Sequence, residues 1–241
     1  MTPRTVLNAV PSALTVGNAV AGLAAITAAG TARTTERALY VGLLLVVVGV
    51  LLDTIDGPLA RALRAQSPLG GQLDSLADGV TFGLASAVLV WHGFVAFGHD
   101  VLGFALAAWW LAAVLLRLAR FNLENDPSVP HLSFTGLSSP AAALLVTASV
   151  SFTAGHDASL WLPVVPAVLL PALMISRLRF VDLPKRYLAR PRCLVELVPI
   201  PVLVPFVGFD GALGLFLAVF VLVSLVPSSR RAGVAETGAA S

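Results

Sequence analysis

The sequence predicts an all-α, polytopic integral membrane protein whose helices pack as a bundle. Of its 241 residues, 57% are hydrophobic and 12% are charged, whereas a soluble domain carries about 25% charged residues. So few charged groups cannot cover a soluble surface. The apolar residues also gather in long runs, without the alternation of a membrane β-barrel. The composition therefore excludes a soluble enzyme, a disordered chain and a nucleic-acid-binding domain, and we expect no nucleic-acid partner.

Eight apolar runs come close to the length of a membrane-spanning helix, which needs about 20 residues. The first run ends at the polar connector 31–37, and the second ends among acidic residues. The connector 96–100 separates the third run from the fourth, and 155–159 separates the fifth from the sixth. Prolines interrupt the seventh run, as membrane helices tolerate when neighbours satisfy the freed backbone. The predicted spans are 10–29, 38–59, 70–94, 101–116, 136–154, 160–175, 195–207 and 211–226.

The basic residues are distributed unevenly between the two ends of the predicted bundle. Arg33 and Arg37 fall on one side, and the remaining 13 of the 15 Lys and Arg residues fall on the side that carries both termini. Cytoplasmic loops of membrane proteins carry the excess of basic residues. We therefore expect a protein of the cell inner or plasma membrane with both termini in the cytoplasm.

Four carboxylates lie where membrane helices rarely carry charge. An aspartate at the centre of such a helix costs about 2.5–3.5 kcal/mol, so four without compensation would cost on the order of 10 kcal/mol. The nearest basic residues, Arg61 and Arg64, are too few to neutralise them, and this deficit points to bound cations. The four acids, on or beside the second and third spans, are Asp53, Asp56, Asp74 and Asp78.

The spacing of these acids predicts that they converge. Asp53 and Asp56 are three apart, and Asp74 and Asp78 are four apart, so each pair shares one helix face. The connector between the helices is short, which makes them antiparallel neighbours with both acidic stripes near the cytoplasmic end. Such an all-oxygen ligand set suits Mg²⁺, Mn²⁺ or Ca²⁺. Histidine is absent from the cluster and Cys193 is distant in sequence, which argues against zinc.

Small residues accompany the acids on the same faces. Gly57 and Ala60 follow Asp56, and Gly70 precedes Asp74 by one turn. Beside bound cations, these small residues would leave a floor on which a flat ligand approaches the backbone. Alternatively, they allow two helices to pack closely, as small residues do in membranes.

The segment from Asp53 to Asp78, DTIDGPLARALRAQSPLGGQLDSLAD, resembles the signature of the CDP-alcohol phosphatidyltransferases. The resemblance implies a six-helix membrane core, here residues 1–180, that forms a homodimer and carries a two-metal site open to the cytoplasm. It implies that an alcohol displaces CMP from a CDP-linked lipid, with two divalent cations, Mg²⁺ or Mn²⁺, as cofactors. Residues 181–227 would add a cytoplasmic connector and two helices, and residues 228–241 a disordered tail.

The same resemblance implies roles for individual residues. The first three acids of the signature bind metal, and the fourth, Asp78, lies near the metals and is the presumed base. Arg61 would contact the polar head of the donor, the CDP-lipid. The expected metal ligands are Asp53, Asp56, Asp74 and Asp78, and the expected cytidine pocket is lined by Gly57, Ala60 and Gly70.

Two further stretches bear on the acceptor alcohol. RLARFN, residues 117–122, closes the fourth span, and FTGLSSPAAA, residues 134–143, opens the fifth. Both are similar to the phosphatidylserine synthase branch of the family, which implies CDP-diacylglycerol and L-serine as substrates, although Ser138 stands where that branch commonly has proline. Arg117 and Arg120 share a face at the depth of the acids, where they would hold the carboxylate of serine or anchor the helix at the membrane surface.

The stretch from Pro11 to Asn18 resembles the start of the family pattern, with Ser12 in place of asparagine. Asn18 would contact the donor or form an interhelical hydrogen bond.

Other functions stay open at this point. The same chemistry could use glycerol 3-phosphate or inositol phosphate as acceptor, or an archaeal ether lipid as donor. The acids could instead form the transport site of a divalent cation transporter, which would need a polar path to the outer face. The outer halves of the second and third spans, 41–50 and 80–90, carry only Thr81 and Ser86 as polar residues, which disfavours transport.

Overall fold

The predicted helical membrane architecture is confirmed. The computed structural model describes residues 3–124, 136–176 and 199–225, and the regular secondary structure in those ranges is entirely helical. The predicted connector 181–194 and the predicted tail 228–241 lie outside the described residues. Among the described residues, the helices long and apolar enough to cross a membrane are Val10–Thr31, Thr35–Ala62, Pro68–Ala96 and Asp100–Leu123, which overlap the first four predicted spans.

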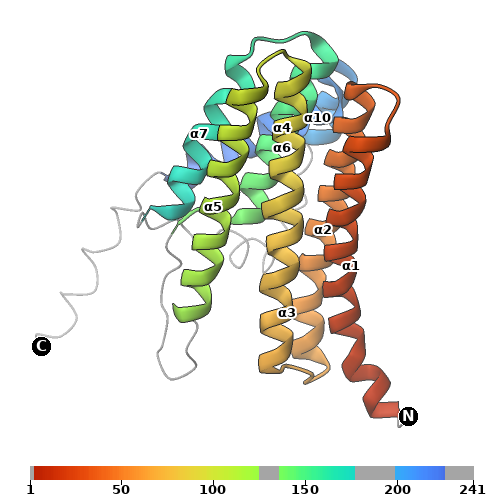
Figure 1. Cartoon of the computed structure of the whole chain (residues 1–241). Helices are drawn as coiled ribbons and strands as arrows, with labels where there is room; N and C mark the ends of the chain where they lie inside the picture. The colour runs from red at the N-terminus through yellow and green to blue at the C-terminus, as the bar shows by residue number, and fades with distance from the viewer. Residues whose placement is uncertain (1–2, 125–135, 177–198, 226–241) are drawn as a thin grey trace, which may run out of the picture.

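Figure 1 shows the first helices standing side by side, with the N-terminus and the α2–α3 connection at the same end of the bundle. The connection is short and brings α3 back alongside α2, as the sequence predicts. In chain order the elements are α1 (Pro3–Thr31), α2 (Thr35–Ala62), α3 (Pro68–Asp78), η1 (Gly79–Ala85), α4 (Ser86–Ala96), α5 (Asp100–Glu124), α6 (Ser139–His156), α7 (Trp161–Ile175) and α10 (Pro199–Leu225).

Local chemistry defines the turn between α2 and α3. Arg64 adopts a left-handed backbone conformation, with φ of 53°, directly after α2. Ser67 then caps α3, because its hydroxyl accepts a hydrogen bond from the N–H of Gly70 at 3.0 Å. Pro68 occupies the first turn of α3, where a missing backbone donor costs nothing. The turn therefore starts α3 directly beside the end of α2.

The third predicted span is one continuous helical rod, but part of it is not an α-helix. α3 passes into the π-helix η1, which passes into α4. Two side chains donate to carbonyl groups of η1: Ser86 Oγ to Thr81 O at 3.3 Å, and the buried Trp110 Nε1 to Phe82 O at 2.9 Å. Hydropathy does not predict η1, since α- and π-helices are equally apolar.

Glycines let α1 and α2 approach η1 closely. A Cβ atom at Gly22 of α1 would lie 2.6 Å from Thr81 Oγ1 and 2.8 Å from Thr81 Cα. A Cβ atom at Gly49 of α2 would lie 2.6 Å from Thr81 Cγ2. Real Cβ atoms essentially never lie this close to a non-bonded atom, so Thr81 fills a notch that only glycine leaves open. This close packing fixes the positions of α1, α2 and η1 relative to one another.

α6 lies at the centre of the second half of the molecule. It is buried along most of its length and packs against α2, α4, α7 and α10. The helix begins at Ser139, whereas the predicted span begins at residue 136. Gly136 has a φ of 88°, a left-handed conformation that a helix cannot include, so the three residues before Ser139 form its approach loop.

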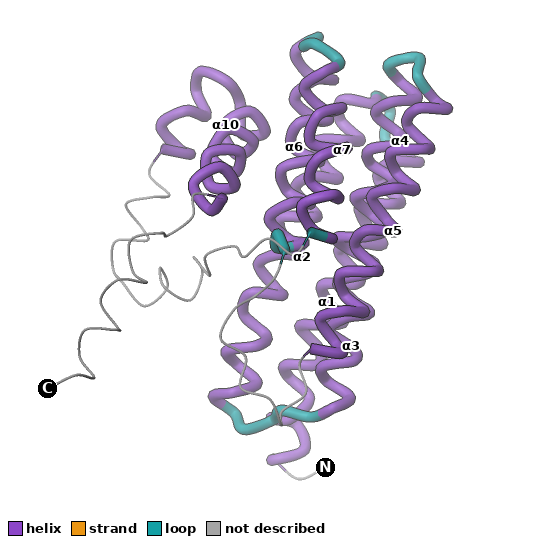
Figure 2. Tube along the Cα trace, turned by 90° about the vertical axis from the view of Figure 1, so that its left-hand side faces the viewer, coloured by secondary structure: helices purple, strands orange, loops and turns teal. Residues whose placement is uncertain are grey.

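α10 covers the described parts of the seventh and eighth predicted spans; residues 195–198 and 226 lie outside the described residues. The helix is broken at Gly208, whose φ is 70° and ψ 171°, between the seventh and eighth predicted spans. Figure 2 shows α10 beside α6 at one side of the bundle. Asp210, 6% exposed, accepts hydrogen bonds from the Ser151 hydroxyl at 3.1 Å and from the N–H of Gly211 at 3.0 Å. The bond from Ser151 joins α10 to α6.

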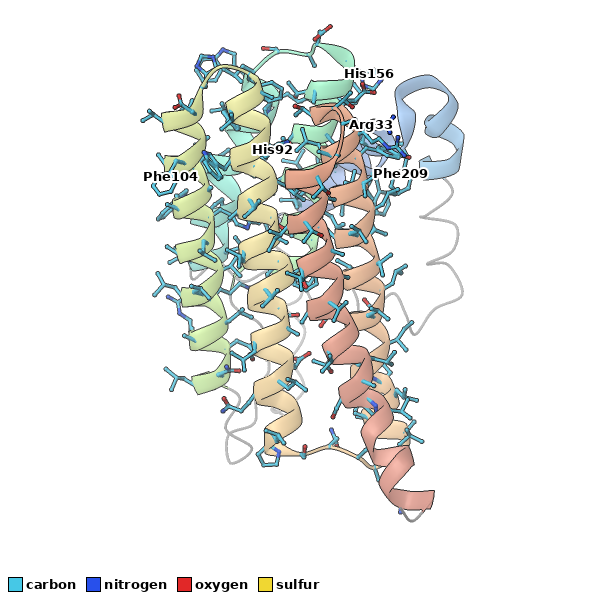
Figure 3. The ribbon with its side chains drawn as sticks, turned by 45° about the vertical axis from the view of Figure 1, so that its right-hand side comes forward. Arg33, His92, Phe104, His156 and Phe209 are labelled. Atoms are coloured by element: carbon cyan, nitrogen blue, oxygen red, sulfur yellow. The ribbon has the colours of Figure 1, made fainter. Side chains whose placement is uncertain are left out.

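Figure 3 distinguishes the two ends of the bundle. Arg33, His156 and Phe209 gather at the end away from the N-terminus and the α2–α3 turn. Phe104 points outward from α5 and is 65% exposed. Other large apolar side chains are exposed along the helices as well. An apolar exterior of this kind matches a lipid environment rather than water.

Candidate active site

The acid cluster forms between α2 and α3. Asp53 and Asp56 of α2 and Asp74 of α3 each offer a carboxylate oxygen, and these oxygens all lie within 4.8 Å of one another. Asp56 is only 6% exposed. Negative charges this close repel each other strongly where water is scarce. The two predicted stripes do face each other, and the cluster they form can hold a metal ion.

Asp78 extends the cluster by one further turn of α3. Its carboxyl group lies beside that of Asp53, and the two groups interact directly. Both acids interact electrostatically with Arg117 of α5. The cluster is therefore approached by one basic side chain from a third helix, as well as by the carboxylates of α2 and α3.

α1 contributes two polar side chains. The Thr15 hydroxyl donates to Asp56 Oδ2 at 2.8 Å, and Asn18 Nδ2 donates to Asp78 Oδ1 at 3.3 Å. The two residues are 5% and 1% exposed. From the sequence, we expect Asn18 either to form an interhelical hydrogen bond or to contact the CDP-lipid. The hydrogen bond is present, and the contact with the CDP-lipid stays a prediction. Thr15 was not singled out, although it lies in the family-like stretch that includes Asn18.

A pocket of about 220 Å³ adjoins the acids at the α2–α3 turn. It brings together the residues that the sequence assigned to donor binding, Gly57, Ala60, Arg61 and Gly70, next to Asp56 and Asp74. Asn18 does not line it. The remaining lining residues, not predicted, are Pro11, Ser12, Thr15, Ala65, Gln66, Ser67 and Gly71.

The glycines of this pocket differ from those that pack helices. A Cβ atom at Gly57 would meet only Arg61 Nη1, at 3.6 Å, and a Cβ atom at Gly70 would meet only Ser67 Oγ, at 3.2 Å. At Gly71 nothing lies within 4 Å. Neither Gly57 nor Gly70 is pressed against a neighbouring helix, so close packing does not explain them. They leave open space beside the acids.

Two larger pockets lie at the other end of the bundle. Their volumes are about 430 and 400 Å³, and Glu36 at the start of α2 lines both. Neither contains a residue of the acid cluster. Volume alone therefore does not mark the functional site, and the smaller pocket beside the acids is the one with metal-binding chemistry.

The RLARFN stretch fastens α5 to three other helices. Arg117 Nη1 donates to the hydroxyl of Ser139 at the start of α6. Arg120 Nη1 donates to the main-chain oxygen of Ile175 at the end of α7, at 2.9 Å. Asn122 Oδ1 accepts from Ser75 of α3 at 2.8 Å. Of the two predicted acceptor residues, Arg117 lies near the acids, whereas the guanidinium of Arg120 bonds the end of α7.

The loop 136–138, directly before α6, supports this arrangement by packing against the end of α7. A Cβ atom at Gly136 would lie 2.5 Å from Met174 O, so the loop backbone passes directly against the end of α7. The N–H of Leu137 donates to Leu173 O at 3.4 Å. These contacts place Ser139 where it can accept from Arg117. The glycine in this stretch is thus explained by a close approach and a positive φ.

The donor atoms of the cluster fit a hard divalent cation. All the predicted ligands are carboxylate oxygens, which Mg²⁺ and Mn²⁺ prefer. The cluster is partly open, because Asp53 and Asp74 are not fully buried, and Asp56 and Asp74 also line the pocket. A cation there could therefore contact both the protein and a ligand in the pocket.

Comparison with known proteins supports this assignment. The chain is 32% identical over 196 residues to a CDP-diacylglycerol–serine O-phosphatidyltransferase of Helicobacter pylori, covering 76% of this chain and 81% of that protein. It is 32% identical over 196 residues to the enzyme of that name from Mycobacterium tuberculosis, of which 66% is covered, just under two thirds. The Bacillus subtilis enzyme of that name is 31% identical over 177 residues, covering 72% of this chain and 90% of the relative.

The family resemblance extends well beyond the acidic signature. A sequence model of the CDP-alcohol phosphatidyltransferases matches residues 8–181, which include most of α1 with Thr15 and Asn18, the acid cluster, the pocket and both arginines. The matched region is the part of the molecule that builds the site. On this evidence the chain belongs to the CDP-alcohol phosphatidyltransferase family.

Proposed function

We propose that the protein transfers the phosphatidyl group of CDP-diacylglycerol to L-serine, forming phosphatidylserine and releasing CMP. The observation that carries the proposal is the pocket in which Gly57, Ala60 and Arg61 adjoin the acid cluster. The names of the similar enzymes from three bacteria supply the acceptor.

The pocket suits the donor. Gly57 and Gly70 leave room for a flat base to approach the backbone, and Arg61 offers a cation for a phosphate. The apolar exterior of the helices lets the acyl chains remain in lipid while the nucleotide enters the polar site. This division explains why a polar reaction takes place within a membrane bundle.

In the proposed reaction the acceptor hydroxyl attacks the phosphorus that carries the lipid. A bond forms between the serine oxygen and that phosphorus, and the bond from the phosphorus to the CMP oxygen breaks. Asp78 accepts the hydroxyl proton. Asp53, Asp56, Asp74 and Asp78 would hold two divalent cations, Mg²⁺ or Mn²⁺, which when bound stabilise negative charge on the phosphoryl and leaving groups.

Arg117 is the better candidate for the serine carboxylate. Its Nη1 bonds Ser139, but its buried Nε has no hydrogen-bond partner among the described residues. An unpartnered buried donor beside the acids is available to an anionic group of the acceptor. Arg120 Nη1 already donates to Ile175 O, which favours a role in packing α7.

Substituting the two arginines separately tests this distinction. In Arg117→Ala the Michaelis constant for serine should rise about ten- to a hundredfold, because one charge-assisted contact contributes about 1.5–3 kcal/mol. The constant for the CDP-lipid should stay within about twofold. Arg120→Ala is the matched control and should instead lower the melting temperature. Equal effects of both substitutions on serine would contradict the assignment to Arg117.

Release of labelled CMP from CDP-diacylglycerol tests the reaction itself. Serine, glycerol 3-phosphate and inositol phosphate are supplied separately, and an ether-linked donor is compared with the ester. We expect CMP release with serine, and phosphatidylserine as the lipid product. Release with glycerol 3-phosphate alone would overturn serine as acceptor and retain the transferase chemistry.

The transport alternative finds no support in the described part of the chain. Thr81 and Ser86, the polar residues of the outer halves of the spans, are both fully buried. Their hydroxyls donate to Asn18 O and Thr81 O, respectively. Both groups are thus engaged within the protein rather than lining a polar path.

Topology and assembly form part of the same proposal. The bias of Lys and Arg supports a cytoplasmic position for both termini and for the acid end of the bundle, and family resemblance supports a homodimer. Labelling of single cysteines from either side of sealed vesicles measures on which side the termini lie. Sedimentation of the detergent-solubilised protein measures whether it is a dimer.

A further inference from the structure

Thr81 lies outside the chemistry described so far, yet it is tied to the site by a hydrogen-bonded chain. Its hydroxyl donates to the main-chain oxygen of Asn18 at 2.8 Å. Asn18 Nδ2 in turn donates to Asp78 Oδ1 at 3.3 Å. Asp78 and Thr81 are three residues apart on the continuous helix formed by α3 and η1. Both bond Asn18 of α1, Asp78 through the side-chain amide and Thr81 through the main-chain oxygen. The orientation of the Asp78 carboxylate is therefore coupled to the position of Thr81.

The position of Thr81 is itself tightly defined. The side chain is fully buried in the notch between Gly22 of α1 and Gly49 of α2. A Cβ atom at Gly49 would also lie 2.8 Å from Asn18 Oδ1, so the same notch confines the amide. The absence of side chains at Gly22 and Gly49 thus brings α1 and α2 close around both Thr81 and the Asn18 amide, so a displacement of one side chain is passed to the other.

The π-helix η1 contributes to this rigidity. Side-chain donors hold the carbonyl groups of two successive residues, Thr81 and Phe82, through Ser86 Oγ and Trp110 Nε1. Single π-turns occur frequently at functional sites. Here the π-helix starts directly after Asp78 and carries Thr81 into the notch.

The buried amide of Asn18 also supports this coupling between Thr81 and Asp78. Its Oδ1 has no hydrogen-bond partner among the described residues. A buried unpaired oxygen costs about 1–3 kcal/mol, and such groups in native structures call for an explanation. Turning the amide over would place oxygen against the Asp78 carboxylate, so the observed orientation is the one that serves Asp78.

We propose that Thr81 is a positioning residue of the active site, which acts through Asn18 to hold the carboxylate of Asp78 toward Asp53. The inference rests on the proposed part of Asp78 in the reaction. Loss of the Thr81 hydroxyl leaves the donor pocket untouched, because the pocket is formed at the α2–α3 turn. It removes the bond to the main-chain oxygen of Asn18 and so loosens the residue whose amide orients the Asp78 carboxylate.

The test compares Thr81→Val, which keeps the shape and removes the hydroxyl, with Thr81→Ser, which restores the hydroxyl. The matched control is Thr147→Val, because Thr147 is also buried and its hydroxyl bonds only carbonyls of α6. In Thr81→Val, kcat per CDP-binding site should fall about tenfold, with the Michaelis constant for CDP-diacylglycerol within about twofold. Thr81→Ser and Thr147→Val should both stay within about threefold of the wild type.

Two readouts separate positioning from general destabilisation. The dissociation constant for Mn²⁺, measured by electron paramagnetic resonance without substrate, should rise several-fold in Thr81→Val alone. In an Asn18→Ala background, adding Thr81→Val should change kcat by less than about twofold, because the route to Asp78 is already broken. If Thr81→Val does not insert, Thr81→Cys, with its weak donor, is measured against the same limits.

The results that would overturn the inference differ from those that would overturn the proposed function. Normal kcat in Thr81→Val, or an equal loss in Thr81→Ser, would refute the positioning role. Multiplicative losses in the double variant would also refute it, because Thr81 would then act independently of Asn18. Full activity of Asp78→Asn in the same assay would instead refute the proposed role of Asp78.

Discussion

Replacing Asp56 by asparagine is expected to lower turnover about a thousandfold while the protein still folds and inserts. The amide has nearly the same shape and can still accept the hydrogen bond that Thr15 donates to Asp56, so packing is preserved. It lacks the negative charge with which the cluster would hold a divalent cation. A cation in such a site contributes several kcal/mol to the transition state, and about 4 kcal/mol corresponds to a thousandfold.

The measurement is CMP release at saturating Mn²⁺, with Asp157→Asn as the control. Asp157 caps the far end of α6 in a left-handed conformation, with φ of 45°, which asparagine also adopts readily. This control should keep wild-type activity. Excess chelator should abolish wild-type turnover, and Mg²⁺ or Mn²⁺ should restore it. Full activity in chelator would exclude the metal-dependent mechanism.

Replacing Gly57 by leucine should strongly weaken donor binding without destabilising the fold. A Cβ atom at Gly57 meets only Arg61 Nη1, at 3.6 Å, so the isobutyl group extends into the pocket of about 220 Å³. Overpacking costs about 1–3 kcal/mol, and here the group displaced is the ligand. Affinity for the CDP-lipid should therefore fall about ten- to a hundredfold. The melting temperature should stay level or rise, since glycine is a poor helix former.

Gly30→Leu provides the comparison for this prediction. Gly30 is an exposed glycine near the end of α1 with nothing within 4 Å of an added Cβ atom, and it does not line the pocket beside the acids. It should bind CDP as the wild type does in a titration with Mn²⁺ present. Normal CDP affinity in Gly57→Leu would show that the pocket does not accept the nucleotide.

The sequence predicts the acid cluster well because its geometry is local. Spacings of three and four residues, together with the short turn after Arg64, bring the carboxylates of α2 and α3 close together independently of the other helices. The same holds for the predicted pocket residues, which lie on either side of that turn, whereas the residues that α1 adds to the pocket were not predicted. Contacts within a helical hairpin depend only on helical periodicity and connector length.

Features that depend on the remaining helices were not predictable. Spacing in the sequence does not distinguish Arg117 from Arg120. In the structure they have different partners, because α6 begins beside Arg117 and α7 ends beside Arg120. The π-helix leaves no sign in hydropathy, and Thr81 resembles any single polar residue in an apolar run. Its role depends on glycines of two other helices, which sequence spacing does not place opposite it.

The two kinds of glycine imply different suppressor genetics. A side chain introduced at Gly49 collides with Thr81 Cγ2, an atom of the protein itself. A smaller residue at position 81 can relieve that part of the collision, so second-site revertants of packing glycines should map to the facing helix. At Gly57 the invaded space is the cavity beside the acids, and the nearest protein atom, Arg61 Nη1 at 3.6 Å, is not in collision with an added Cβ atom. Revertants of such lesions should be confined to the codon itself or to the turn that shapes the cavity.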